Sequence, residues 1–427
     1  MIRSFAGFLF LLVLAACSTP GPVTQISLME PPALYRDSAL NPFPATLPVD
    51  RDIPYATQRV PSDRPGESYG DAPNNILRVG HAQVSIGTKA NPEAGSVSTR
   101  SRAAREAPLF VTVDTIEEQG PLTATRHVAV DPRVFPSDAA AVDTAYAARL
   151  NRQLAAAPGN DLVIYVHGVR SDFENPILAA SELQHFSGYR NVFAAYSWPA
   201  SQRLLTYFQD TEDSIASSFL FRRYVRFLAN QTNAERIHIV AHSAGTRVVM
   251  DAIGQFALQY SRASDATIQS ELNLGHVILI GSDADPRRIG GYLIDGADRV
   301  VDGLTIYTSS TDRALNLSNL VFGGRERLGQ TIVGPVPVYA QQFLAEFEKL
   351  DIIDVSAAEQ SNSANGHGYL RGSPWVSSDI LTIVNFDLSP AERGLVPDAD
   401  GLGWVFPKSY PERLQSAIRQ RNPELVQ

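Results

Sequence analysis

Short apolar runs alternate with amphipathic segments through the middle of the chain. Runs that predict buried strands occupy residues 161–166, 191–199, 276–280, 303–308 and 350–355, and a shorter strand begins at residue 236. Apolar side chains recur at helical spacing in residues 138–156, 175–186, 213–228 and 246–260. Because strands that alternate with helices are typical of βαβ units, this pattern predicts an α/β protein with a mostly parallel central sheet and helices on both faces.

Further elements are expected at both ends of this region. Residues 79–86 alternate apolar and polar side chains and predict the first strand of the domain, and residues 109–113 predict a second. The segment 52–59 is expected to lead into the domain. The tail 387–427 contains an aromatic stretch and a basic helix, and its pattern leaves open whether it covers a pocket or docks a partner.

The composition is that of a globular protein. The chain has 427 residues, of which 44% are hydrophobic and 19% are charged. A net charge of −9 without a basic cluster argues against nucleic acid as a partner. Neither a glycine-rich phosphate loop nor histidines at metal-ligand spacing are present, so we expect no metal and no cofactor.

The N-terminus has the pattern of a targeting segment. Arg3 precedes an apolar run at residues 5–13, and small residues then lead to Cys17, the single cysteine of the chain. The run is too short to span a bilayer and predicts a cleaved signal. The segment resembles a bacterial lipoprotein signal with its lipobox, which implies that Cys17 is lipidated and begins the mature chain. An ordinary signal peptide with a chance cysteine is the alternative.

This interpretation divides the chain into three parts. Residues 1–16 form the signal peptide, residues 17–50 form a proline-rich and poorly packed tether, and residues 51–427 form the folded domain. Ser18 after the lipidated cysteine favours the outer membrane. We therefore expect the protein in the cell envelope, anchored to the membrane through Cys17 and facing the periplasm.

The short strand that begins at residue 236 ends in Ala241-His242-Ser243-Ala244-Gly245, and a helical segment follows. This is the G-x-S-x-G nucleophile elbow with alanine in place of the first glycine. The elbow requires small residues two positions before and two after the serine, because the backbone turns so tightly that larger side chains would collide. Ser243 is therefore the candidate nucleophile, and an ordinary strand-to-helix loop is the alternative.

Several phrases together carry a resemblance to a known superfamily. They are Val166–Gly168, Tyr196–Pro199, Ala241–Gly245, Tyr307–Leu315 and Gly366–Tyr369, with a weaker match at Tyr55–Arg59. Residues 161–380 resemble the esterase/lipase superfamily of α/β-hydrolases, and within it an uncharacterised bacterial hydrolase family. The resemblance implies an α/β-hydrolase fold and a serine, acid and histidine triad in that chain order.

The candidate triad follows from the residues at the carboxyl ends of the predicted strands, where sites of open α/β sheets gather. Serine needs a base to take its proton, and His367 suits that role, with a solvated loop histidine as the alternative. Asp312 follows the strand that usually precedes the acid. Asp283 follows the preceding strand and stays open as an alternative acid, and Asp285 is a weaker neighbour. Each aspartate is also a plausible helix N-cap.

Backbone N–H groups are expected to form the oxyanion hole. The candidates are Ala244, directly after the nucleophile, and Val169, directly after His167-Gly168. We expect His167 to brace that loop and His242 to point away from the nucleophile. Trp198 is expected either to line an acyl pocket or to cap the core.

The function predicted from the sequence is cleavage of a carboxylic ester, carried by a small molecule or a lipid, through an acyl-enzyme. An inactive binding or scaffold lipoprotein with the same fold is one alternative, and an acyltransferase that uses the same triad is another. A peptidase is chemically compatible, but no feature of the sequence indicates a peptide groove.

Overall fold

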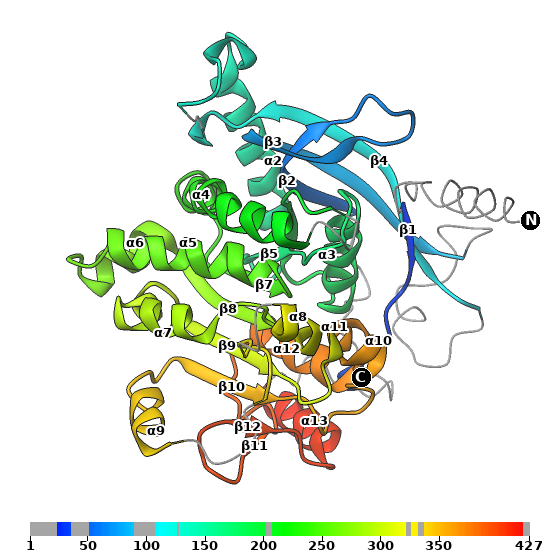
Figure 1. Cartoon of the computed structure of the whole chain (residues 1–427). Helices are drawn as coiled ribbons and strands as arrows, with labels where there is room; N and C mark the ends of the chain where they lie inside the picture. Colours follow the sequence, from blue (N-terminus) through cyan, green and yellow to red (C-terminus); the bar gives the residue numbers. More distant parts are fainter. Residues whose placement is uncertain are drawn as a thin grey trace, which may run out of the picture.

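The fold is organised around one twisted sheet, with the strand order β1-β4-β3-β2-β6-β5-β7-β8-β9-β10-β12-β11 (Figure 1). The computed structural model describes residues 24–35, 51–88, 107–125, 128–201, 207–321, 326–331 and 337–421. The strands are β1 (Gln25–Ser27), β2 (Asp52–Pro61), β3 (Tyr69–Gly87), β4 (Phe110–Pro121), β5 (Leu162–Val166), β6 (Val192–Ser197), β7 (Ile237–His242), β8 (Leu274–Ile280), β9 (Gly303–Thr308), β10 (Leu350–Asp354), β11 (Val396–Pro397) and β12 (Trp404–Val405).

Along the stretch β2-β6-β5-β7-β8-β9-β10-β12 of the sheet, neighbouring strands pair in parallel. Antiparallel pairs occur only toward the two edges of the described sheet, between β1, β4, β3 and β2 and between β12 and β11. The mostly parallel α/β architecture predicted from the hydrophobic pattern is confirmed.

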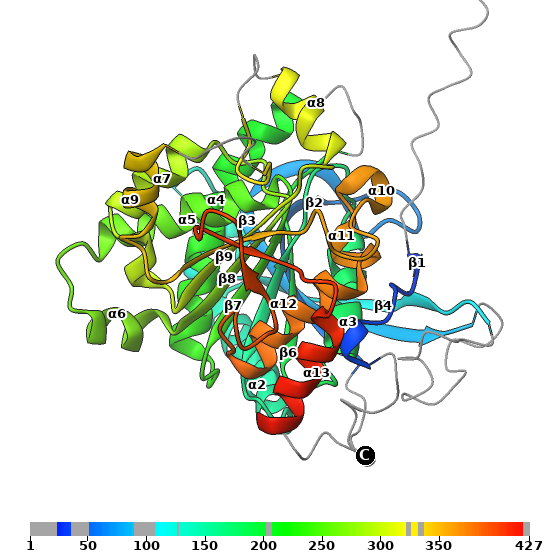
Figure 2. The ribbon, with the colours of Figure 1, turned by 90° about the horizontal axis from the view of Figure 1, so that it is seen from below.

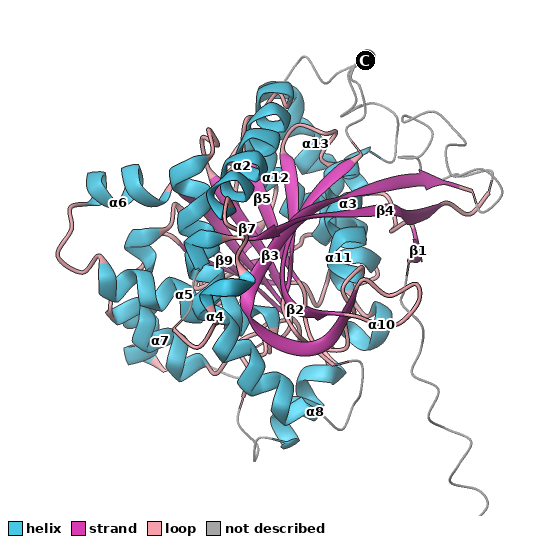
Figure 3. Cartoon of the chain, turned by 90° about the horizontal axis from the view of Figure 1, so that it is seen from above, coloured by secondary structure: helices cyan, strands magenta, loops and turns pink. Residues whose placement is uncertain are grey.

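Helices cover both faces of the sheet, as Figures 2 and 3 show. The helices are α2 (Ala139–Ala156), α3 (Asn175–Phe186), α4 (Tyr207–Gln231), α5 (Gly245–Gln259), α6 (Asp265–Leu272), α7 (Pro286–Ile294), α8 (Arg313–Val321), α9 (Val338–Leu344), α10 (Ser363–Gly366), α11 (Tyr369–Gly372), α12 (Pro374–Phe386) and α13 (Tyr410–Arg421). Helices α2, α4, α5, α6 and α7 pack on one face, whereas α3, α12 and α13 pack on the other.

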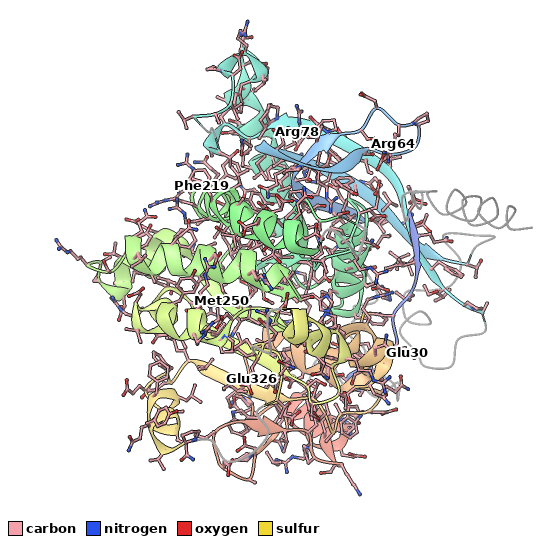
Figure 4. All side chains as sticks on the ribbon, in the orientation of Figure 1. Glu30, Arg64, Arg78, Phe219, Met250 and Glu326 are labelled. Carbon is pink, nitrogen blue, oxygen red and sulfur yellow. The ribbon has the colours of Figure 1, made fainter. Side chains whose placement is uncertain are left out.

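Strand β5 shows why its sequence is apolar throughout. Its alternate residues Ile164 and Val166 join the core under α4 and α5, whereas Val163 and Tyr165 join the core under α3 and α12. Met250 of α5, labelled in Figure 4, is fully buried in the first of these layers. Each large side chain buried in this way contributes about 1.5–3 kcal/mol to folding.

The antiparallel side of the sheet is longer than the sequence pattern indicates. Residues 79–86 and 109–113 lie in strands as predicted, but these are the third and fourth described strands of the chain and not the first and second. Strand β3 already begins at Tyr69 and β4 continues to Pro121. Residues 52–59 form the inner strand β2, which pairs with β6 on one side and β3 on the other. The added stretches of β3 and β4 are largely solvent-exposed and polar, so they carry no apolar alternation.

The prediction of a poorly packed tether is wrong for residues 24–35. Strand β1 pairs with β4, and the 3-10 turn Ala33–Tyr35 is buried. The Leu34 amide donates to the Ser378 hydroxyl of α12 (3.0 Å), and the Met29 amide donates to the Glu182 carboxylate of α3 (2.7 Å). This segment stays ordered because its apolar side chains, among them Leu34 at 1% exposure, complete the core under α3 and α12.

The predicted signal peptide, Cys17 and the rest of the predicted tether lie outside the described residues. Among the helices that the structure does describe, none has the length and apolarity needed to cross a membrane.

The C-terminal tail extends the sheet. Strand β12 pairs in parallel with β10, and α13 buries Tyr410, Leu414 and Ile418 against the core. Trp375 and Phe406 lie beside Tyr410. The residues of the tail up to 421 therefore complete the fold.

Candidate active site

The candidate nucleophile sits on a strained turn between β7 and α5. Ser243 has a φ of 53°, a left-handed conformation that is unfavourable for a residue with a side chain. Its amide donates to the Ile280 carbonyl at the end of β8 (2.9 Å), and its carbonyl accepts from the Thr246 hydroxyl (2.6 Å). These bonds hold the backbone in the strained conformation, as expected of a nucleophile elbow.

Two glycines explain the need for small residues around the elbow. A Cβ at Gly245 would lie 2.3 Å from the His167 carbonyl oxygen and 2.8 Å from that of Val166. A Cβ at Gly168 would lie 2.7 Å from the Ser243 Cβ. The end of β5 and the elbow therefore pack against each other without room for further side chains.

His367 is hydrogen-bonded to Asp312. The His367 Nδ1 and the Asp312 Oδ2 are 2.6 Å apart, and Asp312 is 1% exposed. The other carboxylate oxygen accepts from the Leu315 amide in the first turn of α8 (3.0 Å), so both oxygens are held. Since a carboxylate only accepts, Nδ1 carries the hydrogen, and Nε2 is left as the basic nitrogen of the neutral ring.

The imidazole of His367 lies at the same strand ends as Ser243. A Cβ at Gly281, directly after Ile280, would lie 3.0 Å from the His367 Cε1. Gly281 has a φ of 53°, and its amide donates to the Tyr369 hydroxyl (2.5 Å). Ser243 and His367, far apart in the sequence, therefore lie against consecutive residues at the end of β8.

His242 was expected to point away from the nucleophile, and in the structure its side chain contacts the loop that carries His367. Its Nε2 lies 3.1 Å from the His367 carbonyl oxygen, and the two rings are 4.9 Å apart. Burial, and then the neighbouring His367, lower the pKa of His242 to about 4. His242 is therefore neutral at pH 7 and donates from Nε2 to the loop that carries His367.

The alternative acids have other partners. The carboxylate of Asp283 is buried and pairs with Arg247 (2.7 Å), while the Ser318 hydroxyl donates to it (2.5 Å). Asp285 caps α7, because its carboxylate accepts from the Arg287 amide (3.0 Å). The structure thus brings Asp312 to His367 and gives the other two aspartates structural contacts.

The candidate oxyanion donors come from the elbow itself and from the loop after β5. Ala244 directly precedes α5, where the first backbone N–H groups have no acceptor within the helix. Val169 belongs to the segment 167–172 that follows β5, which we call the strap. The Trp198 Nε1 donates to the His167 carbonyl of this strap (2.6 Å).

His167 and Trp198 brace the strap from inside. Their rings stack at 5.3 Å with an interplanar angle of 6°, and both side chains are buried. Burial, and then the charge of Arg59, lower the pKa of His167 to about 3, so its ring is neutral. The structural role expected for His167 agrees with these contacts, and Trp198 lies in the core.

Arg59 is a residue of this region for which the sequence indicated no role. Its side chain is completely buried, and its Nη2 donates to the Ser171 carbonyl of the strap (2.7 Å). The sequence signal was the single charged residue at the end of Tyr55–Arg59, the phrase with the weaker family resemblance.

A polar hollow of about 410 Å³ adjoins the loops that carry Asp312 and His367. It is lined by Ser310, Thr311, Arg313, Asn316, Asn362 and Asn365. No group of three histidine, cysteine, aspartate or glutamate side chains that suits a metal ion occurs in the part of the chain that the structure describes.

The fold and the elbow define an α/β-hydrolase. Residues 142–383, more than half of the chain, match the family model described as "Alpha/beta hydrolase of unknown function (DUF900)". The chain therefore belongs to this family of α/β-hydrolases.

Solved structures with some likeness to the chain include two bacterial esterases. Esterase B from Lactobacillus rhamnosis, in an inhibited form, is 12% identical, with 52% of this chain and 74% of that chain covered and a TM-score of 0.28. Thermogutta terrifontis esterase 2, phosphoramylated by tabun, is 12% identical, with 53% and 81% covered and a TM-score of 0.30. The comparison with curated proteins gives no match. The family assignment rests on the family model.

Proposed function

We propose that the protein hydrolyses carboxylic esters through an acyl-enzyme formed on Ser243. The observation that carries the proposal is the His367–Asp312 hydrogen bond at the strand ends where the strained Ser243 sits. Membership of an α/β-hydrolase family supports hydrolysis as the class of reaction.

Each residue of the site has a separate role in this reaction. His367 Nε2 takes the proton from Ser243 Oγ while the oxygen attacks the carbonyl carbon of the ester. Asp312 accepts from Nδ1, which fixes the tautomer and stabilises the imidazolium that forms. The imidazolium then returns the proton to the departing alkoxide, so an alcohol leaves and an acyl-enzyme remains.

The second half of the reaction repeats these steps with water. His367 takes a proton from water as its oxygen attacks the acyl carbonyl, and Ser243 Oγ leaves with that proton. In both halves the backbone N–H groups of Ala244 and Val169 bind the oxyanion. One such donor contributes about 2.7–4 kcal/mol to transition-state stabilisation.

The test is a screen of p-nitrophenyl esters across acyl chain lengths with the wild type and Ser243→Ala. We expect turnover of at least one ester by the wild type and none above background by the variant. Equal rates would contradict the proposal. A competing alcohol in the same assay distinguishes transfer from hydrolysis, because an acyltransferase yields the new ester in place of the free acid.

We also propose that a lipid on Cys17 anchors this activity to the bacterial cell envelope. The lipobox-like sequence before Cys17 supports the anchor. Expression with radiolabelled palmitate should label the wild type and not Cys17→Ser. Label in both proteins, or in neither, would contradict the anchor.

A further inference from the structure

The polar hollow beside the candidate triad is built from the same loops that hold the acid and the base. Thr311 and Arg313 flank Asp312, and Asn365 lies two positions before His367. A Cβ at Gly366 would lie 2.2 Å from the Thr311 carbonyl oxygen, so the two loops pack directly on each other. Helices α8 and α10 lie side by side at this edge of the molecule (Figures 2 and 3).

The lining of the hollow offers hydrogen-bond donors that have no partner among the described residues. Arg313 is exposed and forms no ion pair or hydrogen bond with any described residue, whereas Arg287 and Arg299 are paired with aspartates. The side-chain amides of Asn362 and Asn365 are likewise unbonded within the described part of the chain. Asn365 adopts a left-handed φ of 62°.

No acidic side chain of the described residues lines the hollow. A guanidinium accompanied by amide N–H groups binds carboxylate and phosphate oxygens through charge-assisted hydrogen bonds. In a chain with a net charge of −9, such a site supplies local attraction for an anion that the rest of the protein repels.

We propose that this hollow binds an anionic group, a carboxylate or a phosphate, carried by the ester substrate. The proposal rests on the proposed function, because it places the charged end of the substrate beside the His367–Asp312 pair. Arg313 then determines specificity and takes no part in bond breaking.

The experiment compares kcat/KM for matched esters. The neutral probe is p-nitrophenyl butyrate, and the anionic probes are mono-p-nitrophenyl succinate and an ester of the same length that ends in a phosphate. We expect Arg313→Gln to lower the anionic-to-neutral ratio by roughly tenfold. Arg313→Lys should lower it less. The matched control is Arg262→Gln, which removes an exposed arginine after α5 and should leave the ratio unchanged.

The outcomes separate this proposal from the function on which it rests. An unchanged ratio in Arg313→Gln, with active hydrolysis of the neutral ester, would overturn the anion site alone. A larger effect on the succinate or on the phosphate ester identifies the source of the charge. If no ester is hydrolysed, calorimetric titration of succinate and of inorganic phosphate into the wild type and Arg313→Gln tests the anion site directly. Binding that Arg313→Gln abolishes would support the site, and equal or absent binding would overturn it.

A different observation concerns Arg59 and the strap. Besides the Ser171 carbonyl, the guanidinium donates to the Ser197 hydroxyl (3.0 Å) and to the carbonyl oxygens of Gly70 and Ala200 (3.3 Å each). Arg59 thus connects β3 with the loops after β5 and β6. The strap is fixed at its start by Trp198 and at its end by Arg59, with Val169 between them.

We infer that Arg59 is a positioning residue for the oxyanion donor of the strap. Arg170, next to Val169, has a left-handed φ of 57°, so the strap needs external bonds to keep its conformation. The Ser171 carbonyl is two residues from the Val169 amide, and movement of this carbonyl displaces that amide.

The experiment separates positioning from stability. Arg59→Met and Arg59→Lys are compared with Arg393→Met, which also loses a buried arginine but one that pairs with Asp379 (2.8 Å) far along the chain from the strap. We expect Arg59→Met to lower kcat by about 10²-fold. The affinity for an alkyl boronic acid, an inhibitor that mimics the tetrahedral oxyanion, should fall by a similar factor of about 10². KM should change little, and Arg59→Lys should recover part of the loss.

Equal effects of Arg59→Met and Arg393→Met on kcat and boronate inhibition would overturn the inference. If Arg59→Met does not fold, Arg59→Lys carries the comparison. If no ester is hydrolysed, hydrogen exchange of the strap amides replaces kinetics. Faster exchange in Arg59→Lys than in Arg393→Met would support the inference, and equal exchange would contradict it.

Discussion

Replacement of Asp312 by asparagine tests which aspartate serves His367. The asparagine oxygen can still accept from the Leu315 amide, so the start of α8 is retained. The side-chain NH₂ then faces the His367 Nδ1, which must lose its hydrogen to accept from it. The imidazole therefore carries its hydrogen on Nε2 and no longer accepts the serine proton.

The expected loss is large because the change removes both the tautomer and the negative charge. A wrong tautomer lowers kcat by about 10⁴-fold, which corresponds to about 5.4 kcal/mol of transition-state stabilisation. The free energy of unfolding should change little, since the cap on α8 is kept. Steady-state hydrolysis of a short-chain ester and urea unfolding measure the two quantities.

Asp283→Asn is the matched comparison, because Asp283 was the alternative acid. Its buried carboxylate pairs with Arg247, so the substitution should lower stability by about 3–5 kcal/mol. The kcat of the folded fraction should stay within about tenfold of the wild type, since the Asp283 carboxylate contacts Arg247, Ser318 and Arg327, whereas His367 is hydrogen-bonded to Asp312. If Asp283→Asn abolished turnover while Asp312→Asn kept it, the assignment of the acid would be refuted.

Three further predictions concern the frame around the site. His167 has a folded pKa of about 3 against about 6.5 unfolded, so its contribution to stability is lost as pH falls below 6.5. Between pH 7 and pH 5, the free energy of unfolding measured in urea should therefore fall by about 2 kcal/mol less in His167→Gln than in the wild type. An equal fall in both proteins would contradict this. Gly245→Ala should reduce ester hydrolysis by roughly 10²-fold or more, because its methyl group would meet the His167 carbonyl, and normal turnover would exclude this close contact between strap and elbow. Leu34→Ala should lower the free energy of unfolding by about 2–4 kcal/mol, and a change below about 0.5 kcal/mol would show that residues 24–35 do not pack as described.

The fold could be predicted from the sequence where hydrophobic pattern and burial coincide. Strands such as β5 are buried on both faces, so their continuous apolar runs mark them directly. The first half of β3 is exposed, and its place in the sheet depends on pairing with β2, which no local pattern reveals. The packing of residues 24–35 was missed for a related reason. Prolines and polar residues suggested a tether, whereas distant partners on α3 and α12 hold the segment.

The candidate site was predictable in part. Chain order and strand ends indicated Ser243 and His367 as candidates. The same reasoning preferred Asp312 as the acid and kept Asp283 as the alternative, because both follow strands. Which aspartate serves as the acid depends on tertiary contacts, since Asp283 pairs with Arg247 while Asp312 pairs with His367. Arg59 could not be predicted to contact the strap, because the partners of its guanidinium come from three separate loops and strands.

The mass of the protein after reaction with a fluorophosphonate, followed by peptide mapping, tests whether Ser243 is the nucleophile. A reactive serine at the elbow predicts one adduct, located on Ser243, whose formation slows severely in Asp312→Asn and vanishes in Ser243→Ala. An adduct on another residue would contradict the assignment of Ser243 as the nucleophile. Ester hydrolysis by Ser243→Ala at the wild-type rate would contradict it as well.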